Sequence, residues 1–404
     1  MRVGVAGAGA FGRNHLRVYR ELETVGLGVA LVAAVEPDAV RAADAEAKYG
    51  IPVYSTVGEL LSADLKLNAA SVAVPTVHHH AVASALLDAG LDLLVEKPLA
   101  ASLAEADDLI ALADKGRRIL QPGHLERFNP AVLAVEPKLR RPMFFESHRL
   151  SVFTLRALDV DVVLDLMIHD LDIVLTFAAS PVREVRAVGL PILSPKVDIA
   201  NVRVEFESGC VANFTASRVS TERVRKLRFF EPRQYVSIDY ARQDLLVIRI
   251  DKDASATQPA GIASLVQKAM AAGLDPGKLA ALAAALPKDV VAAISAGKID
   301  AEVMAKITAT GLIDPAILAK LGLSAPLTAG GPAPGLSFVK SEVTPGEPLK
   351  LEIQSFLDSV RTRRAPRVTA RQGRDALALA LEIQSTMAAH AHRAGLDDFY
   401  ETRS

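Results

Sequence analysis

The chain has 404 residues, of which 50% are hydrophobic, and it balances 46 Lys and Arg against 47 Asp and Glu. Because this length exceeds one ordinary hydrophobic core, we expect two domains. The balanced charge excludes a strongly basic surface for nucleic acid or for an anionic membrane, and it therefore favours a small-molecule partner.

Cysteine usage and the first residues indicate a cytoplasmic protein. The single cysteine, Cys210, excludes an internal disulfide, and without a Cys cluster we expect no metal site. The opening run MRVGVAGAG has no basic leader before its apolar residues, so we expect no signal peptide. The longest stretch without a formal charge, residues 67–87, contains Pro75 and three histidines, so we expect no membrane span.

Residues 1–122 alternate short β-branched runs with stretches that can form helices. This alternation is typical of the α/β class and predicts a doubly wound parallel sheet of the Rossmann type. The strands are expected at 2–6, 29–35, 69–74, 92–95 and 118–121.

The sequence GAGAFG at residues 7–12 follows the first expected strand and precedes a helical stretch. Gly7 permits a tight turn, Gly9 lets the backbone approach a pyrophosphate, and Gly12 allows close packing of helix on strand. The backbone of Ala10 and Phe11 completes a loop whose N–H groups can face phosphates. A simple tight turn is the alternative, but the position between strand and helix favours a dinucleotide site.

Glu36 ends the second expected strand, at the distance where an acidic residue binds the ribose hydroxyls of NAD. The sequence therefore favours NAD. Arg41 lies five residues further on, and its guanidinium could meet the 2′-phosphate of NADP instead.

Two further groups of polar residues follow strands of the first domain. Lys97, in the sequence EKP, comes directly after the strand at 92–95 and so at the edge where ligands bind such sheets. An exposed surface lysine is the alternative. His78, His79 and His80 follow another strand, but adjacent side chains diverge and no acidic or thiol partner is near, so we expect no metal there.

Residues 123–130, GHLERFNP, lie where the chain leaves the first domain. We expect their polar side chains to line the cleft between the domains as substrate contacts, although an ion pair or a helix cap would explain each one singly. These side chains are His124, Glu126, Arg127 and Asn129.

The sequence DLMIHDLDIVL carries a carboxylate and an imidazole four residues apart, Asp165 and His169, which predicts that they stack on one face of a helix. In this pattern Asp165 orients the ring while His169 takes a proton from an alcohol. A structural Asp–His hydrogen bond is the alternative. Asp172 is a candidate second orienting group, whereas Asp170 is expected to face elsewhere.

The pattern changes after residue 122, because strand-like runs follow one another from about 182 to 250. We expect a second domain of α+β type, formed by 123–250 and 336–404, with a large, open, mostly antiparallel sheet. Its helices are expected from 349 and over 372–391. Residues 251–335 are Ala-rich and punctuated by Asp-Pro pairs, which predicts a helical insert.

The glycine loop, PTVHH, EKPLA, GHLERFNP and DLMIHDLD occur in this order, and the chain thereby resembles the Gfo/Idh/MocA oxidoreductase family over about 1–250 and 337–392. The resemblance implies that Lys97 is the catalytic lysine and that Asp165 and His169 are the acid–base pair. It also implies cofactor contacts near the nicotinamide and ribose. These contacts are Pro75, Thr76, His79 and Glu96.

Members of this family transfer a hydride between NAD(P) and a carbon of a sugar, cyclitol or nucleotide sugar. The stretch from His148 to Asp172, with GHLERFNP, is most similar to the group that oxidises C3 of UDP-N-acetylglucosamine. For such a substrate, Arg149 and Arg156 are candidate phosphate contacts. Free-sugar or inositol oxidation, a redox-neutral glycosidase or epimerase, and a non-catalytic NAD sensor remain alternatives. Open sheets of this kind pack on a copy of themselves, so we expect a homodimer or homotetramer.

Overall fold

The structure is a computed structural model that describes residues 1–154, 160–250, 336–341 and 343–401. The chain forms two compact units, of which the first comprises 1–247 with 340–404 and the second 248–339. Almost all of the second unit, including the expected helical insert at 251–335, lies outside the described residues. No helix in the described ranges is long and apolar enough to cross a membrane.

The first sheet has six parallel strands in the order β3-β2-β1-β4-β5-β6. The order reverses between β1 and β4, which is where open α/β sheets bind ligands at the carboxyl edge. The expected doubly wound sheet is thus confirmed; the sequence did not predict the short strand β3. The strands are β1 Arg2–Ala6, β2 Ala30–Val35, β3 Val53–Tyr54, β4 Ala69–Val72, β5 Asp92–Glu96 and β6 Leu120–Gly123.

Helices alternate with these strands, and α2, α3 and α5 begin at side chains that accept hydrogen bonds from the first turn. Asp38 caps α2, Thr56 forms a capping box with Glu59 in α3, and Ser102 caps α5. The helices are α1 Gly12–Thr24, α2 Ala39–Tyr49, α3 Val57–Ser62, α4 His79–Asp88 and α5 Leu103–Gly116, with the short 3₁₀ turn η1 Thr76–His78.

The second sheet has eight strands in the order β14-β13-β12-β11-β7-β10-β9-β8. The described pairings are antiparallel except that of β7 with β10, so the expected mostly antiparallel sheet is confirmed. The sequence analysis missed β7, although it lies in the middle of the sheet. The strands are β7 Phe144–Leu150, β8 Val182–Leu190, β9 Ile199–Phe206, β10 Val211–Ser217, β11 Val224–Glu231, β12 Gln234–Asp239, β13 Asp244–Ile250 and β14 Leu336–Ser341.

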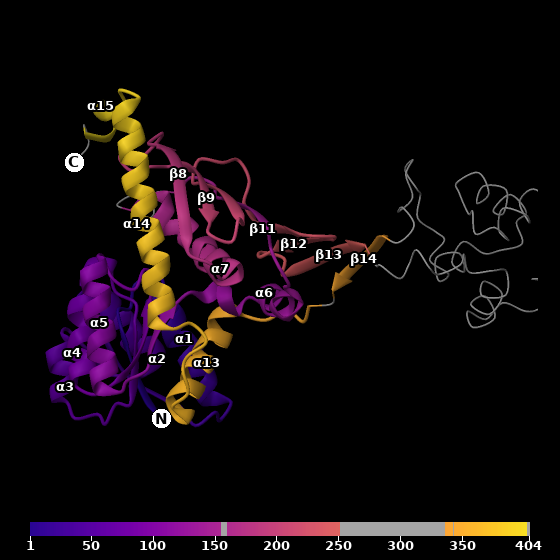
Figure 1. Cartoon of the computed structure of the whole chain (residues 1–404). Helices are drawn as coiled ribbons and strands as arrows, with labels where there is room; N and C mark the ends of the chain where they lie inside the picture. Colours follow the sequence, from indigo (N-terminus) through magenta and orange to yellow (C-terminus); the bar gives the residue numbers. More distant parts are fainter. Residues whose placement is uncertain (155–159, 251–335, 342, 402–404) are drawn as a thin grey trace, which may run out of the picture. The chain divides into compact units, whose positions relative to one another are not determined.

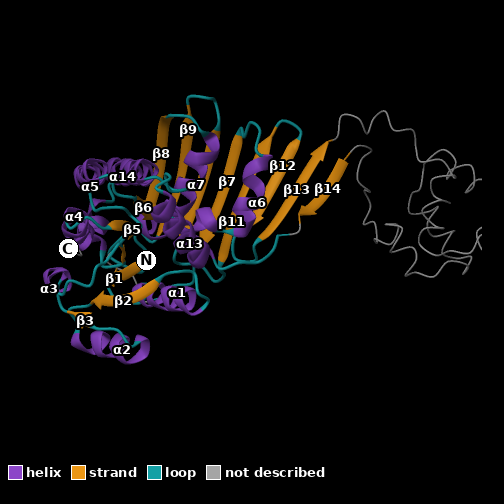
Figure 2. Cartoon of the chain, turned by 90° about the horizontal axis from the view of Figure 1, so that it is seen from below, coloured by secondary structure: helices purple, strands orange, loops and turns teal. Residues whose placement is uncertain are grey.

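Short helical segments cover one face of this sheet, with α6 and α7 lying across it in both views (Figures 1 and 2). Their apolar residues join a large core with the inward side chains of the strands. Beyond residue 123, the described helical segments of the chain are η2 Leu125–Phe128, α6 Pro130–Val135, η3 Glu136–Lys138, the π-helical turn η4 Val163–Met167, α7 Ile168–Ala178, α13 Pro348–Thr362, α14 Ala370–Arg393 and α15 Asp397–Glu401.

Helix α13 belongs structurally to the first domain, although the sequence analysis assigned it to the second. Its buried residues Ile353 and Phe356 share a core with Val3, Leu16 and Tyr19. The sequence pattern does not predict which domain α13 packs against, because an amphipathic stripe shows only that one face of a helix is covered. Helix α14 instead spans both domains, since it contacts α5 and β8.

Candidate active site

The glycine loop has the geometry that a pyrophosphate requires. Gly7 has φ +94°, and a Cβ there would lie 2.6 Å from the carbonyl oxygen of Ala73. A Cβ on Gly12 would overlap the carbonyl oxygen of Gly7, whereas a Cβ on Gly9 would meet no atom within 4 Å. Two glycines are therefore needed by the fold itself, and the third leaves open space for a ligand.

Glu36 lies at the end of β2 and is almost fully buried. Its Oε2 accepts a hydrogen bond from the backbone N–H of Ala8 at 2.9 Å, and its Oε1 accepts one from Arg41 at 2.8 Å. Although burial opposes ionisation, the Arg41 guanidinium and the N–H groups of Ala8 and Asp38 lower the pKa of Glu36. The carboxylate is thus ionised and fixed beside the loop, and Arg41 is held by it.

A cavity of about 620 Å³ opens over this edge of the sheet. Four of the expected cofactor residues line it: Gly7, Gly9, Glu36 and Pro75. The sequence analysis did not assign other lining residues to the cofactor, among them Ser55 and Thr56, which lie outside any motif, and His78, which it considered only for a metal site. Ala10, Phe11, Gly12, Thr76, His79 and Glu96 do not line it.

The positions of His79 and Glu96 differ from the expectation that they touch the cofactor. His79 is buried, with Nδ1 2.9 Å from the carbonyl oxygen of Pro98 and Nε2 3.0 Å from that of Val74. Glu96 is held from below, with Oε1 2.9 Å from Nε2 of His15. Through these bonds His79 and Glu96 stabilise the segments that carry Pro75 and Lys97. Contact of either side chain with a cofactor stays a prediction.

Lys97 follows β5 and reaches across to the second domain. Its Nζ donates to the carbonyl oxygens of Leu164 at 3.2 Å and Asp165 at 2.6 Å, and it lies 3.9 Å from the Asp165 carboxylate. Burial lowers the pKa of Lys97, and the carboxylates of Asp165 and Glu96 oppose this shift. The exposed surface lysine considered as an alternative is thereby ruled out, since only 18% of this side chain is accessible.

The turn that carries Asp165 is π-helical, not α-helical, and this changes the expected acid–base pair. In a π turn the hydrogen bonds run from i to i+5, so residues four apart no longer stack. Asp165 accordingly faces Lys97, and Nδ1 of His169 has no hydrogen-bond partner in the described chain. Asp165 therefore does not orient the imidazole as the sequence predicted.

His169 lies in the first turn of α7, next to the π turn. Burial lowers its pKa well below the usual value, and the charges of Lys97 and Arg149 lower it further. The neutral ring, which can accept a proton, is thus the form present at neutral pH.

The residues of GHLERFNP are buried, which corrects the expectation that they line an open cleft. Arg127 pairs with Asp172 at 3.5 Å and donates to Thr176. Asn129 caps α6, and its amide also donates to the carbonyl oxygen of Tyr240 at 3.0 Å. These partners already satisfy Arg127 and Asn129, whereas neither ring nitrogen of His124 has a hydrogen-bond partner among the described residues. The role of the four polar side chains as substrate contacts stays a prediction.

Arg149 also differs from its expected place as a phosphate contact. It is buried, with Nε 2.6 Å from Asp170 and Nη1 3.1 Å from Glu126, and its guanidinium lies over the Tyr240 ring. Two carboxylates thus neutralise its charge. Arg156, the other expected phosphate contact, lies outside the described residues.

Two buried groups behind Lys97 carried no signal in the sequence. His15 links Glu96 to Ser71, and Ser71 in turn bonds Tyr19 at 2.8 Å. Glu352 on α13 is fully buried, both of its carboxyl oxygens lack a partner among the described residues, and burial raises its pKa well above the usual value. No group of three or more His, Cys, Asp or Glu side chains in the described ranges is placed to hold a metal ion.

Comparison with known proteins agrees with this architecture. Residues 1–124 match the model of the Gfo/Idh/MocA oxidoreductases with an NAD-binding Rossmann fold, and residues 132–233 match the C-terminal domain of the same family. The chain belongs to the Gfo/Idh/MocA family. It is therefore an NAD-dependent oxidoreductase, as the glycine loop and Glu36 predicted.

Several relatives of the chain are named sugar or cyclitol dehydrogenases. It is 36% identical to UDP-N-acetylglucosamine 3-dehydrogenase of Acidithiobacillus ferrooxidans over 246 residues, which are 61% of this chain and 76% of the relative. It is 31% identical to an inositol 2-dehydrogenase of Acidothermus cellulolyticus over 196 residues, which are 46% of this chain and 56% of that one.

Solved structures give the same result. The Acidithiobacillus ferrooxidans enzyme superposes with a TM-score of 0.72 at 27% identity, covering 96% of this chain and 98% of the other. An oxidoreductase from Agrobacterium radiobacter, solved with NAD+, L-tartaric acid and magnesium, shares the fold with a TM-score of 0.68 at 13% identity, covering 96% of each chain.

Proposed function

We propose that this oxidoreductase oxidises a secondary alcohol of a nucleotide sugar, with C3 of UDP-N-acetylglucosamine as the preferred site. The observation that carries the proposal is that Lys97 bonds the π turn beside His169 at the same sheet edge as the glycine loop, with β4 between the two strands that carry them. The 36% identity to UDP-N-acetylglucosamine 3-dehydrogenase supports this substrate over a free sugar.

The residues at the strand edge fit NAD. Gly9 leaves room for the pyrophosphate, and the ionised Glu36 is placed to meet the ribose hydroxyls. NAD, when bound, accepts the hydride that leaves the substrate carbon. A 2′-phosphate would meet the charge of Glu36, so the arrangement favours NAD over NADP, with Arg41 already engaged.

In the proposed mechanism His169 takes the hydroxyl proton, because its ring is neutral at the working pH. The Lys97 ammonium stabilises the negative charge that develops on the substrate oxygen. Asp165 lies on the π turn beside Lys97 and so positions this lysine. The sequence analysis had predicted instead that Asp165 positions His169.

The test is absorbance at 340 nm with NAD and with NADP, against UDP-N-acetylglucosamine, other UDP-sugars, free sugars and inositols. We expect NADH to form with UDP-N-acetylglucosamine. A signal with inositol alone would replace the proposed substrate by that of the second group of relatives. Product formation without net NADH would indicate a redox-neutral enzyme, and no reaction across the panel would refute the proposal.

The remaining expectations are proposals as well. We propose the domain limits given above with α13 assigned to the first domain, a cytoplasmic location, and a homodimer or homotetramer formed through the open sheet. Light scattering at micromolar concentration tests the assembly, and a monomer would contradict it.

A further inference from the structure

Three side chains, the buried His124 and Asp172 and the half-buried His169, carry buried polar atoms without a hydrogen-bond partner in the described chain. These atoms are Nδ1 of His169, both ring nitrogens of His124, and Oδ2 of Asp172. Buried polar atoms in proteins almost always bond to protein or to ordered water. Four orphaned atoms on three titratable residues therefore indicate a shared polar path and not isolated defects.

Helix packing and electrostatic interactions bring the three residues near one another. His169 and Asp172 are three residues apart on α7 and so lie on the same side of that helix. His124 directly precedes η2, and η2 packs against α7. The charge of His124 acts on His169, and the carboxylate of Asp172 acts on His124, so each ring senses the next group along this path.

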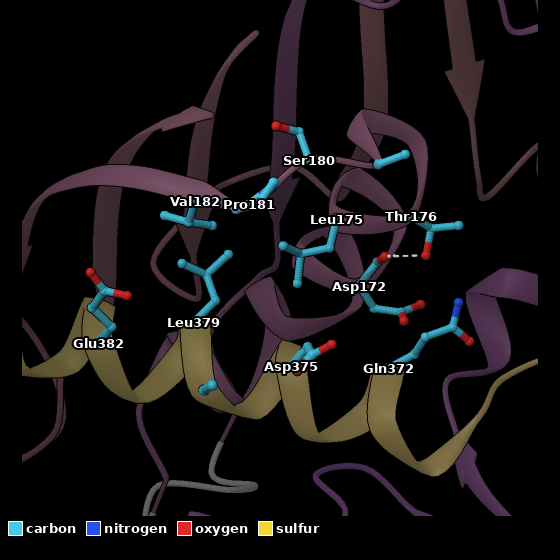
Figure 3. A pocket seen from close by; sticks show the side chains of 12 residues that line it. Asp172, Leu175, Thr176, Ser180, Pro181, Val182, Gln372, Asp375, Leu379 and Glu382 are labelled. Atoms are coloured by element: carbon cyan, nitrogen blue, oxygen red, sulfur yellow. Dashed lines mark hydrogen bonds between the residues drawn. The ribbon is translucent and has the colours of Figure 1, made fainter. Parts of the chain in front are cut away.

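Asp172 is also the point where this path meets a groove. The groove has a volume of about 520 Å³ and lies between α7 and α14, with Thr176 and Gln372 next to Asp172 (Figure 3). The hydroxyl of Thr176 donates to the backbone carbonyl of Asp172 at 2.9 Å. Asp375 and Glu382 line the groove from α14 and are exposed, so the groove communicates with solvent.

A base at His169 needs such a path. The proton that it receives would make the ring cationic in a buried place that already holds Lys97 and Arg149. A histidine can avoid this charge if its second nitrogen releases a proton as the first one accepts. Nδ1 of His169, which is buried on the inner side, is the nitrogen available for the release.

We propose that His124 and Asp172 form a proton exit that carries the substrate proton from His169 to the groove between α7 and α14. This inference rests on the proposed alcohol oxidation. The substrate hydroxyl gives its proton to Nε2 of His169, and Nδ1 of the same ring gives one, through bound water, to His124. The other nitrogen of His124 passes a proton to Oδ2 of Asp172, which releases it into the water of the groove, so that every residue ends with the net charge with which it began.

The charged groups around His124 are compatible with this direction of transfer. Lys97 and Arg127 disfavour a lasting cation on the ring, whereas Asp172 and Glu96 favour its transient formation. Arg127 bonds Oδ1 of Asp172, which leaves Oδ2 for the proton. His124 and Asp172 are thus positioning residues that act through His169, not groups that touch the substrate.

The main test is Asp172→Asn, with Asp375→Asn as the matched control, because Asp375 lines the same groove but is exposed. We expect Asp172→Asn to lower kcat about 10- to 100-fold, the lower part of the range for assisted proton transfer, without changing KM or NAD affinity. Imidazole or formate added to the buffer should restore part of kcat. Asp375→Asn should behave as the parent enzyme.

Unchanged kcat in folded Asp172→Asn would overturn the proton exit. A loss of kcat that neither small buffer restores, together with weaker NAD binding, would also overturn it, since the role would then be to hold Arg127. His124→Gln gives a second variant, for which the same loss and the same rescue by imidazole are expected.

A measurement without substrate separates this inference from the proposed function. Hydrogen exchange at the histidine C2 positions, followed by mass spectrometry, gives the pKa of each ring in the NAD complex. If no panel substrate is oxidised, the proposed function fails. The proton exit is then tested by the pKa of His124 in the Asp172→Asn variant. A pKa of His124 lower than in the parent enzyme supports the proton exit, and an unchanged pKa overturns it.

Discussion

The nucleotide loop and the Lys97 site lie a few residues from the same sheet edge, yet they are built differently. The loop depends on its backbone, since Gly7 and Gly12 leave no room for a Cβ and Gly9 leaves open space for a ligand. The Lys97 site is made by side chains and a distorted helix from segments 68 residues apart. The first depends on local geometry, and the second depends on how two domains meet.

This difference in construction determines what a sequence motif can predict about a residue. A glycine pattern fixes its own role, because the tight turn and the close approach are properties of neighbouring residues. The DLMIHD pattern identifies Asp165 and His169 but not what they contact, since the π turn is produced in the folded chain.

The largest effect is expected from removing the charge that joins the two domains. Lys97→Met should lower kcat about 100- to 10,000-fold, because the substrate oxygen loses its stabilising cation. NAD binding, followed by fluorescence, should stay near that of the parent, since the glycine loop is untouched. Near-normal turnover in a folded Lys97→Met variant would show that the side-chain site is not the chemical one.

Two glycine variants separate the two roles of the loop, which are ligand binding and folding. Gly9→Ala should fold normally, because its Cβ meets no protein atom, but it should weaken NAD binding about tenfold or more by blocking the pyrophosphate. Gly12→Ala should instead lower the melting temperature, because its Cβ overlaps the Gly7 carbonyl. Calorimetry and NAD titration measure both, and equal effects in the two variants would contradict the division of roles.

The same distinction between local geometry and long-range contacts explains which features could be predicted from the sequence. The fold class, the strands of the first sheet other than β3, and the tight turn and close packing at Gly7 and Gly12 follow from local patterns and are seen in the structure. Glu126 was expected as a substrate contact in the cleft between the domains and Arg149 as a phosphate contact, but Arg149 forms buried ion pairs with Glu126 and Asp170. The partners of a charged side chain depend on long-range packing, which periodicity and spacing do not encode.

A pH profile tests whether Asp165 serves Lys97 or His169. Asp165 raises the pKa of Lys97 against the effect of burial, so Asp165→Asn should lower it further. Lys97 must be protonated to act, and the alkaline loss of kcat should therefore begin at lower pH in the variant. The acid limb, set by His169 below its usual pKa of 6.5, should stay in place. A shift of the acid limb alone would restore the expected Asp165–His169 pair.

The smallest effect is expected at Glu352, where the side-chain site meets the core of the first domain. Its pKa is raised in the folded state, so the folded protein keeps a proton that the unfolded chain loses above about pH 4.5. This group thus costs stability increasingly as pH rises above that value. Glu352→Gln removes the cost and keeps the shape, so melting should rise by roughly 2–4 °C per kcal/mol gained. The gain should be larger at pH 7.5 than at pH 5. A decrease at pH 7.5 would mean that an ionised Glu352 stabilises the fold, and that the buried groups behind Lys97 depend on its charge.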